Sequence, residues 1–190
     1  MKQIFLMTVG FTHCGKEFLV DKIIEKIPSF FNRINTSPIH DFLNQTYPAF
    51  KDDNTVGGRA YKMRDEASRT FRLEIVDILL KHGRSVILES CNLAAEKRKN
   101  TLEKVKKINP DIKTVIIYFD VPEEKILQNL KEADERSIAK GEAPPWVELY
   151  EKVQKKDFEE PDPEESDYFI TYNWKNVDEV LERVRRIIES

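Results

Sequence analysis

Two glycines and a lysine near the start of the chain have the spacing of a phosphate-binding loop. Gly10, Gly15 and Lys16 give G-x-x-x-x-G-K, directly after an apolar run typical of a strand and at the start of a helical pattern. In such a loop, backbone N–H groups and the positive helix end converge on phosphate oxygens, and the lysine neutralises phosphate charge. The spacing therefore predicts an ATP site in which Lys16 is also catalytic. The expected nucleotide contacts are Gly10, Phe11, Thr12, His13, Cys14, Gly15, Lys16 and Glu17.

The loop departs from the usual motif at two positions. Glu17 stands where a serine or threonine hydroxyl normally binds Mg²⁺, and His13 fills a position often held by glycine. A carboxylate could bind Mg²⁺ directly, since hard oxygen ligands suit that ion. The same carboxylate would repel the phosphates if no metal intervened. Glu17 therefore decides whether nucleotide binding leads to metal-dependent turnover.

A second acid lies at the end of another apolar strand pattern. Glu89 closes the segment 85–89, and in P-loop proteins this location carries a carboxylate that serves Mg²⁺ or orients water. We therefore expect Glu89 to be catalytic and to share Mg²⁺ with Glu17.

The residues after Glu89 carry a family resemblance. Glu89, Cys91, Asn92 and Arg98 resemble the "D-x-T-N…R" element of P-loop kinases of the polynucleotide-kinase type, a group that includes zeta-toxin-like and small-molecule kinases. Glu89 replaces the aspartate and Cys91 the threonine. The segment 158–165 is similar to the "F-E-x-P-x-x-E-E" run of these kinases. Gln128, Asn129, Arg136, Gly141 and Pro144 are similar to residues of their lid.

This resemblance covers nearly the whole chain and carries specific implications. It implies a three-layer α/β fold with a five-stranded parallel sheet of order 2-3-1-4-5 and a small helical lid at about 131–145. It also implies that Asn92 and Arg98 bind nucleotide and that Arg136 stabilises charge on the transferred phosphoryl group. The expected activity is ATP- and Mg²⁺-dependent transfer of the γ-phosphate to a hydroxyl.

The resemblance leaves the catalytic base open. The best register places Ser37 at the family's aspartate and His40 at its arginine, with Asp41 one position further. Asp41 could take the acceptor's proton after a small shift of the helix start. Alternatively the base is absent, and Ser37 before Pro38 caps a helix.

No motif identifies the phosphoryl acceptor. It would bind in the variable segment 43–64, and a nucleic-acid end, a nucleoside or another small molecule is a candidate. Four arginines follow in one expected helix, at spacings of five, five and three residues. These spacings form no single stripe, so we expect surface residues rather than a site for an acceptor phosphate. They are Arg59, Arg64, Arg69 and Arg72.

Alternating strand and helix patterns must position these residues. With 190 residues, 40% hydrophobic and 34% charged, the chain has the size of one domain, and we expect a single P-loop domain over 1–190. Strands are expected at 3–9, 30–36, 85–89, 113–120 and 168–172. Helices are expected at 16–27, from 37, at 59–82 and 94–108, from 122, at 146–158 and after a cap at Asn176. The charged stretch 131–145 is expected to be a mobile appendage.

The composition of the chain limits its expected partners and its expected location. A net charge of −3 implies no general attraction to nucleic acid or membrane. Cys14 and Cys91 fit neither a zinc pattern nor a disulfide framework, so we expect two free thiols in neighbouring site loops. No apolar run is long enough to span a bilayer, and no motif indicates a protein partner. A cytoplasmic location is the default expectation.

Three functions are compatible with this pattern. A kinase acting on a hydroxyl agrees best with the loop, the segment from Glu89 to Arg98 and the lid-like segment. A nucleotide-binding module with weakened transfer would explain the departures at His13, Glu17 and Ser37. A nucleotide hydrolase fits less well, because a lid that excludes water favours transfer.

Overall fold

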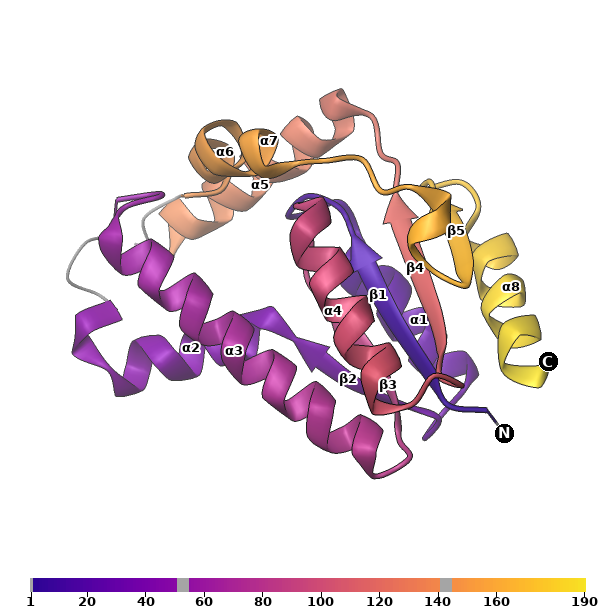
Figure 1. Ribbon diagram of the computed structural model, residues 1–190. Helices are drawn as coiled ribbons and strands as arrows, with labels where there is room; N and C mark the ends of the chain where they lie inside the picture. The colour runs from indigo at the N-terminus through magenta and orange to yellow at the C-terminus, as the bar shows by residue number, and fades with distance from the viewer. Residues whose placement is uncertain (1, 51–54, 141–144) are drawn as a thin grey trace.

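The computed structural model describes residues 2–50, 55–140 and 145–190. Its centre is a parallel sheet of order β2-β3-β1-β4-β5, which confirms the expected topology (Figure 1). The strands are β1 (Ile4–Val9), β2 (Phe31–Asn35), β3 (Ser85–Glu89), β4 (Lys113–Phe119) and β5 (Tyr168–Tyr172). β1 and β3 are buried along their whole length, which explains their unbroken apolar character.

Helices cover both faces of this sheet. One face packs against α1 (Lys16–Lys26) and α8 (Val177–Glu189), through buried residues such as Leu19, Ile23 and Val184. The other face packs against α3 (Arg59–Lys81) and α4 (Ala95–Ile108), through residues such as Val76 and Leu102 (Figure 1). Most of the remaining segments lie beyond the carboxyl edge of the sheet, and the last of them lies beside α4. They are α2 (Thr36–Thr46), η1 (Pro48–Phe50), α5 (Glu123–Ala139), α6 (Trp146–Leu149), the π-helical turn η2 (Tyr150–Gln154), α7 (Lys155–Asp157) and η3 (Pro163–Glu165).

Two helix boundaries differ from the expectation. α2 begins at Thr36, and the Asn35 side chain accepts from the Ser37 backbone N–H, so Asn35 caps this helix and Ser37 does not. Asn176 stands at the N-cap position of α8, but its amide donates to Thr171 O and gives the helix no side-chain cap.

The charged stretch after residue 130 is also more regular than expected. α5 continues through it to Ala139, because Leu130 and Ala133 are buried against the protein and hold this end of the helix. The glycine and the first proline of the expected lid, Gly141 and Pro144, lie outside the described residues. Among the residues that are described, no helix is long and apolar enough to cross a membrane.

We expect Gly10→Ala to destabilise the protein more than Gly83→Ala. Both glycines have a positive φ, but a Cβ on Gly10 would lie 2.7 Å from Phe119 Cβ, whereas nothing lies within 4 Å of one on Gly83. The strain of a positive φ alone costs about 1–2 kcal/mol, and the clash should add about 1–3 kcal/mol. Urea unfolding of both variants measures the difference, and equal losses would contradict it.

Candidate functional site

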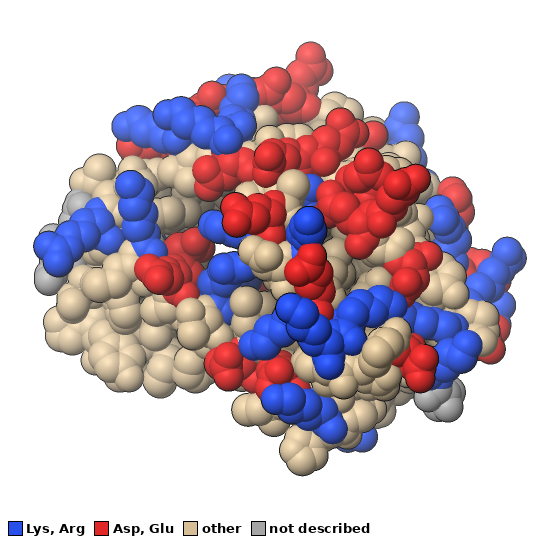
Figure 2. Space-filling view, viewed as in Figure 1, with Lys and Arg blue, Asp and Glu red and all other residues tan. Residues whose placement is uncertain are grey.

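One large cavity opens at the carboxyl edge of the sheet. Its volume is about 2040 Å³, and its walls come from the phosphate loop, the ends of β2 and β3, α2, α3 and the segment α6–η2–α7. Figure 2 shows the corresponding hollow between α3 and the α6–α7 region, with side chains of both charges around it. The cavity is therefore bounded by the phosphate loop on one side and by helices α2 and α3 on the other.

The phosphate loop presents unused backbone donors. Among the described residues, no acceptor is found for the N–H groups of His13, Gly15, Lys16, Glu17 and Phe18. Gly15, with a φ of 96°, is the N-cap residue of α1. Free N–H groups at a helix start form an anion site. The Lys16 ammonium meanwhile donates to the carbonyls of Gly10 and Phe11, within the same loop.

His13 contributes a further unused polar atom to this loop. It adopts a left-handed φ of 59°, and its Nε2 is buried without a hydrogen-bond partner among the described residues. Its ring lies edge-on to Trp146 of α6. Burial, Lys16 and Arg136 lower the pKa of His13, so the ring is neutral at pH 7. A neutral ring at this cavity wall can offer one N–H to a phosphate oxygen.

The π-helical turn brings Gln154 onto the loop. The Gln154 side chain is buried, accepts from the Thr12 N–H at 3.1 Å and donates to the Thr12 hydroxyl. The same amide lies 3.8 Å from Cys91 Sγ. Sequence reasoning missed Gln154, because a regular helix was expected over 146–158 and the contact spans 142 residues of chain. Isolated π-turns are frequent at functional sites.

An arginine connects the two carboxylates expected to bind Mg²⁺. Arg33 Nε donates to Glu89 Oε2 at 2.6 Å, and its NH2 lies 3.8 Å from Glu17 Oε1. Arg33 also pairs with Asp21 at 2.6 Å. Sequence reasoning did not identify this arginine, which lies in the middle of β2.

The two carboxylates still fit a divalent cation. Glu89 Oε1 has no hydrogen-bond partner among the described residues, and the Glu17 side chain is 75% exposed. The carboxylate oxygens of Glu89 and Glu17 are hard ligands of the kind that Mg²⁺ prefers. Among the described residues there is no group of three or more His, Cys, Asp or Glu that could hold a metal by itself, so nucleotide oxygens or water would complete the coordination.

The loop after β3 supports the phosphate loop through hydrogen bonds. The Asn92 amide donates to Thr8 O at 2.8 Å, and the Gly10 N–H donates to Cys91 O at 3.0 Å. Asn92 lines the cavity with a left-handed φ of 48°. Cys14 and Cys91 are both free thiols, as expected, and burial raises the pKa of the Cys14 thiol.

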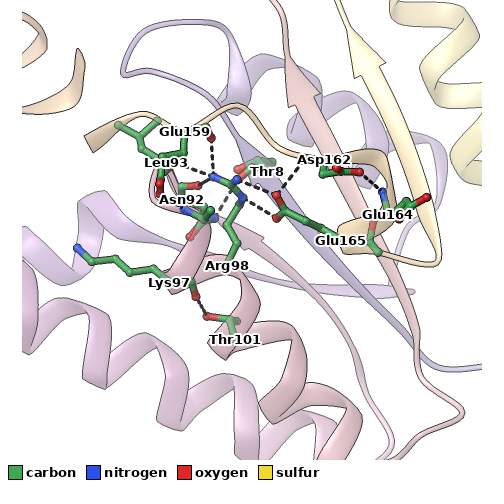
Figure 3. Close-up of polar contacts among 12 residues, drawn as sticks. Thr8, Asn92, Leu93, Lys97, Arg98, Thr101, Glu159, Asp162, Glu164 and Glu165 are labelled. Atoms are coloured by element: carbon green, nitrogen blue, oxygen red, sulfur yellow. Dashed lines mark hydrogen bonds and ion pairs between the residues drawn. The ribbon is translucent and has the colours of Figure 1, made fainter. Parts of the chain in front are cut away.

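Arg98 does not line the cavity, contrary to its expected nucleotide contact. It is completely buried, and its Nε and NH2 donate to Glu165 at 2.7 and 2.8 Å (Figure 3). Its NH1 donates to the carbonyls of Asn92, Leu93 and Glu159. This geometry joins the β3–α4 loop to the chain before β5. Arg98 therefore supports the β3–α4 loop, which borders the cavity.

Two other expected catalytic residues lie outside the cavity lining. Asp41 is exposed on α2, and Arg136 is exposed on α5 near His13; neither is among the described residues that line the cavity. Asp65 of α3 does line it, and its charge acts on His40, Tyr61 and Arg72. Asp65 was not considered from the sequence, because it is one of many acids in a charged helix.

The arginines of α3 correct the expectation of surface residues. Arg64, Arg69 and Arg72 line the cavity, and Arg72 is only 6% exposed. Arg59 alone is exposed and absent from the described lining. The expectation was wrong because residues need not form one narrow stripe to line a cavity. A broad face of α3 lines this one.

His40 lies against these arginines. Burial, followed by the charges of Arg64 and Arg72, lowers the pKa of His40 to about 4, despite opposing effects of Asp65 and Asp41. Its Nε2 is buried and has no partner among the described residues. The α3 wall of the cavity is therefore positively charged around a neutral imidazole.

We expect Arg98→Met to lower the free energy of unfolding by about 3–5 kcal/mol, because it leaves the partly buried Glu165 carboxylate unpaired. Arg185→Met removes an exposed partner of Glu182 and should cost at most about 1 kcal/mol. Chemical unfolding of both variants tests this. A loss below 1 kcal/mol for Arg98→Met would show that the pair does not stabilise the fold.

The low pKa of His40 predicts a stability loss in acid. The unfolded chain takes up the proton near pH 6.5 and the folded chain only near pH 4, so stability falls as pH falls through this range. Between pH 7 and pH 4, the wild type should lose roughly 3 kcal/mol more than His40→Asn. His82→Asn, at the exposed end of α3, is the control and should follow the wild type. Parallel pH profiles for wild type and His40→Asn would refute this assignment.

Known proteins resemble this chain in structure but not in sequence. Neither a protein-family model nor a curated protein sequence matches this chain. A candidate kinase from Chloroflexus aurantiacus superposes with a TM-score of 0.74 at 12% identity, covering 98% of each chain. A sugar kinase from Janibacter gives 0.60 at 16% identity, covering 98% of this chain and 95% of that one.

An APS kinase from Mycobacterium tuberculosis, solved with AMPPNP and APS, is also similar. It superposes with a TM-score of 0.57 at 15% identity and covers 100% of this chain and 99% of that chain. Identities this low establish the fold alone. The chain has the five-stranded α/β fold found in P-loop small-molecule kinases.

Proposed function

We propose that this chain is an ATP-dependent phosphotransferase that moves the γ-phosphate to a hydroxyl of a small molecule or a nucleic-acid end. The observation that carries the proposal is the shared cavity. Free N–H groups of the phosphate loop and the charged wall of α3 line the same space. A donor nucleotide and an acceptor can therefore meet in it without crossing bulk solvent.

The residues of the loop have distinct proposed roles. The free N–H groups bind the phosphates, and Lys16 leaves its loop carbonyls to neutralise the charge that develops on transfer. Glu89 and Glu17 would hold Mg²⁺, which neutralises and orients phosphate oxygens when bound. Arg33 pairs with Glu89 and fixes the direction of its carboxylate. Arg136, which lies close to His13, is a candidate to approach the phosphates from α5.

We propose Asp65 as the general base. It lines the cavity together with Tyr61 and Arg72, whereas Asp41 lies outside the described lining. A carboxylate at the cavity wall can accept the proton of an acceptor hydroxyl. The segment containing Trp146 and Gln154 covers the phosphate loop and would exclude water during transfer.

One contact favours a second candidate function, a nucleotide-binding module with little transfer. Arg33 already neutralises Glu89 and approaches Glu17, so both carboxylates have less charge to offer a cation. Such a module would bind ATP and gain stability from it without turnover.

Transfer from [γ-³²P]ATP with Mg²⁺ to a panel of hydroxyl compounds tests the proposal. Lys16→Ala should lower kcat/KM by about 10² or more, since it removes charge stabilisation of the transferred group. Lys22→Ala, on the same helix but paired with Glu25 at the surface, should retain full activity. Thermal unfolding with ATP is measured in parallel.

The outcomes separate the candidates. Stabilisation by ATP with no labelled product would favour the binding module. Release of labelled phosphate without any acceptor product would favour the hydrolase. Transfer that persists unchanged in Lys16→Ala would overturn the assignment of the phosphate loop.

A further inference from the structure

We propose that the phosphoryl acceptor carries an oxyanion, a phosphate or a carboxylate, which is bound by Arg64, Arg69 and Arg72 of α3. This inference rests on the proposed function and specifies its substrate class. It makes the α3 wall a second anion site, separate from the phosphate loop, within the same cavity.

The three arginines share one face of α3 with other cavity residues. Successive residues of an α-helix are rotated by about 100°, so positions 61, 64, 65, 68, 69 and 72 fall within an arc of about 140°. Five of these six residues line the cavity; Ser68 is buried behind them. A broad cationic face therefore borders the space in front of β2 and β3.

Arg72 is the centre of this face, and it forms no ion pair among the described residues, although the charge of Asp65 acts on it. It is 6% exposed, and its Nε donates to Ser68 O and its NH1 to Thr36 Oγ1, at 3.2 and 2.9 Å. Among the described residues, no carboxylate lies within ion-pair distance of Arg64, Arg69 or Arg72. Burying an unpaired charge is costly, so such groups normally have a partner.

Arg98, which is buried, and Arg33, which is half-buried, show the contrast. Arg98 forms a two-point contact with Glu165, and Arg33 pairs with both Glu89 and Asp21. Their charges are therefore satisfied within the protein. The charge of Arg72 can therefore be neutralised by an anionic ligand that enters the cavity.

Neighbouring side chains also present unused donors. Arg64 Nε and His40 Nε2 are buried without partners among the described residues, although Arg64 NH1 donates to Asn44. The Arg64 guanidinium lies 5.6 Å from the centre of the Tyr61 ring. Orphaned buried donors are rare in folded proteins and point to a missing ligand.

An oxyanion is the ligand that matches this set. Guanidinium groups bind phosphate and carboxylate through paired N–H donors, with charge-assisted hydrogen bonds. Asp65 on the same face leaves a net positive charge from the three arginines, and it suits a molecule that places a hydroxyl at the carboxylate and its anionic group at the arginines. Arg72 also contacts Thr36, whose hydroxyl donates to Glu89 O, so this anion would be held beside the end of β3.

The test measures anion binding to protein saturated with ADP and Mg²⁺. Inorganic phosphate and acetate are titrated separately by calorimetry, and the tighter ligand identifies the acceptor's group. Wild-type protein should bind one anion per chain. Arg72→Gln and the double variant Arg64→Gln/Arg69→Gln should each weaken binding about tenfold or more. Arg59→Gln, on the same helix but exposed, should bind within about twofold of wild type.

Two controls assign the anion to its site. In Lys16→Ala without nucleotide, phosphate binding should persist, because the α3 site does not use the loop. Should phosphate binding disappear in Lys16→Ala and survive in the α3 variants, the anion belongs to the loop and the inference is overturned. The double variant covers the case in which Arg72→Gln fails to fold, since neither of its arginines bonds across the buried interior.

The nucleotide's own γ-phosphate is the competing ligand. If Arg72→Gln weakens AMPPNP binding but leaves ADP binding and phosphate binding unchanged, Arg72 contacts the donor and the inference is overturned. Failure of the wild type to bind ADP would refute the proposed function itself. ADP binding without a second anion would refute only the inference about the acceptor.

Discussion

The guanidinium of Arg98 holds together the segments on which the site depends. It lies on α4, yet its partners belong to the β3–α4 loop and to the chain that leads into β5. A buried arginine with a bidentate carboxylate and three carbonyl acceptors has little freedom to move. Because Leu93 O also accepts from Glu159 N, the two segments are joined by backbone and side chain together.

The position of the phosphate loop depends on the β3–α4 loop, which Arg98 holds in place. The β3–α4 loop reaches β1 through Asn92 and Thr8, and it holds the Gly10 N–H through Cys91 O. On the other side, Gln154 binds the Thr12 N–H, and Asn129 donates to His13 O. The loop is thus fixed by residues from three distant parts of the chain, while the donors at the start of α1 stay available. Rigid support with free donors is what an anion site requires.

Charge around the cavity divides into satisfied and unsatisfied groups. Arg33 and Arg98 are paired with carboxylates, so they stabilise and orient their surroundings. Among the described residues, Lys16 donates to carbonyls and a thiol, and Arg72 donates to a carbonyl and a hydroxyl. Lys16 and Arg72 therefore carry the positive charge that a bound anion would neutralise. Lys16 and Arg72 line the same cavity, Lys16 from the phosphate loop and Arg72 from α3.

The sequence by itself determined the local elements and the phosphate loop. Apolar runs and helical periods placed all five strands within a residue or so of their ends, because buried parallel strands have a strong local pattern. G-x-x-x-x-G-K predicted a phosphate-binding loop, since the chemistry of this motif is contained in seven consecutive residues. The strand order came from family resemblance, because no local pattern encodes which strands are neighbours.

Only the tertiary structure decided the role of the charged residues. Arg98 and Glu165 are 67 positions apart, Arg33 and Glu89 are 56 apart, and no local signal links either pair. Asp65 and Arg72 resemble any other charges of a long helix until α3 is packed along the cavity. The sequence shows which side chains are charged. Whether a charge is paired depends on which groups of opposite charge the fold places within a few ångströms of it.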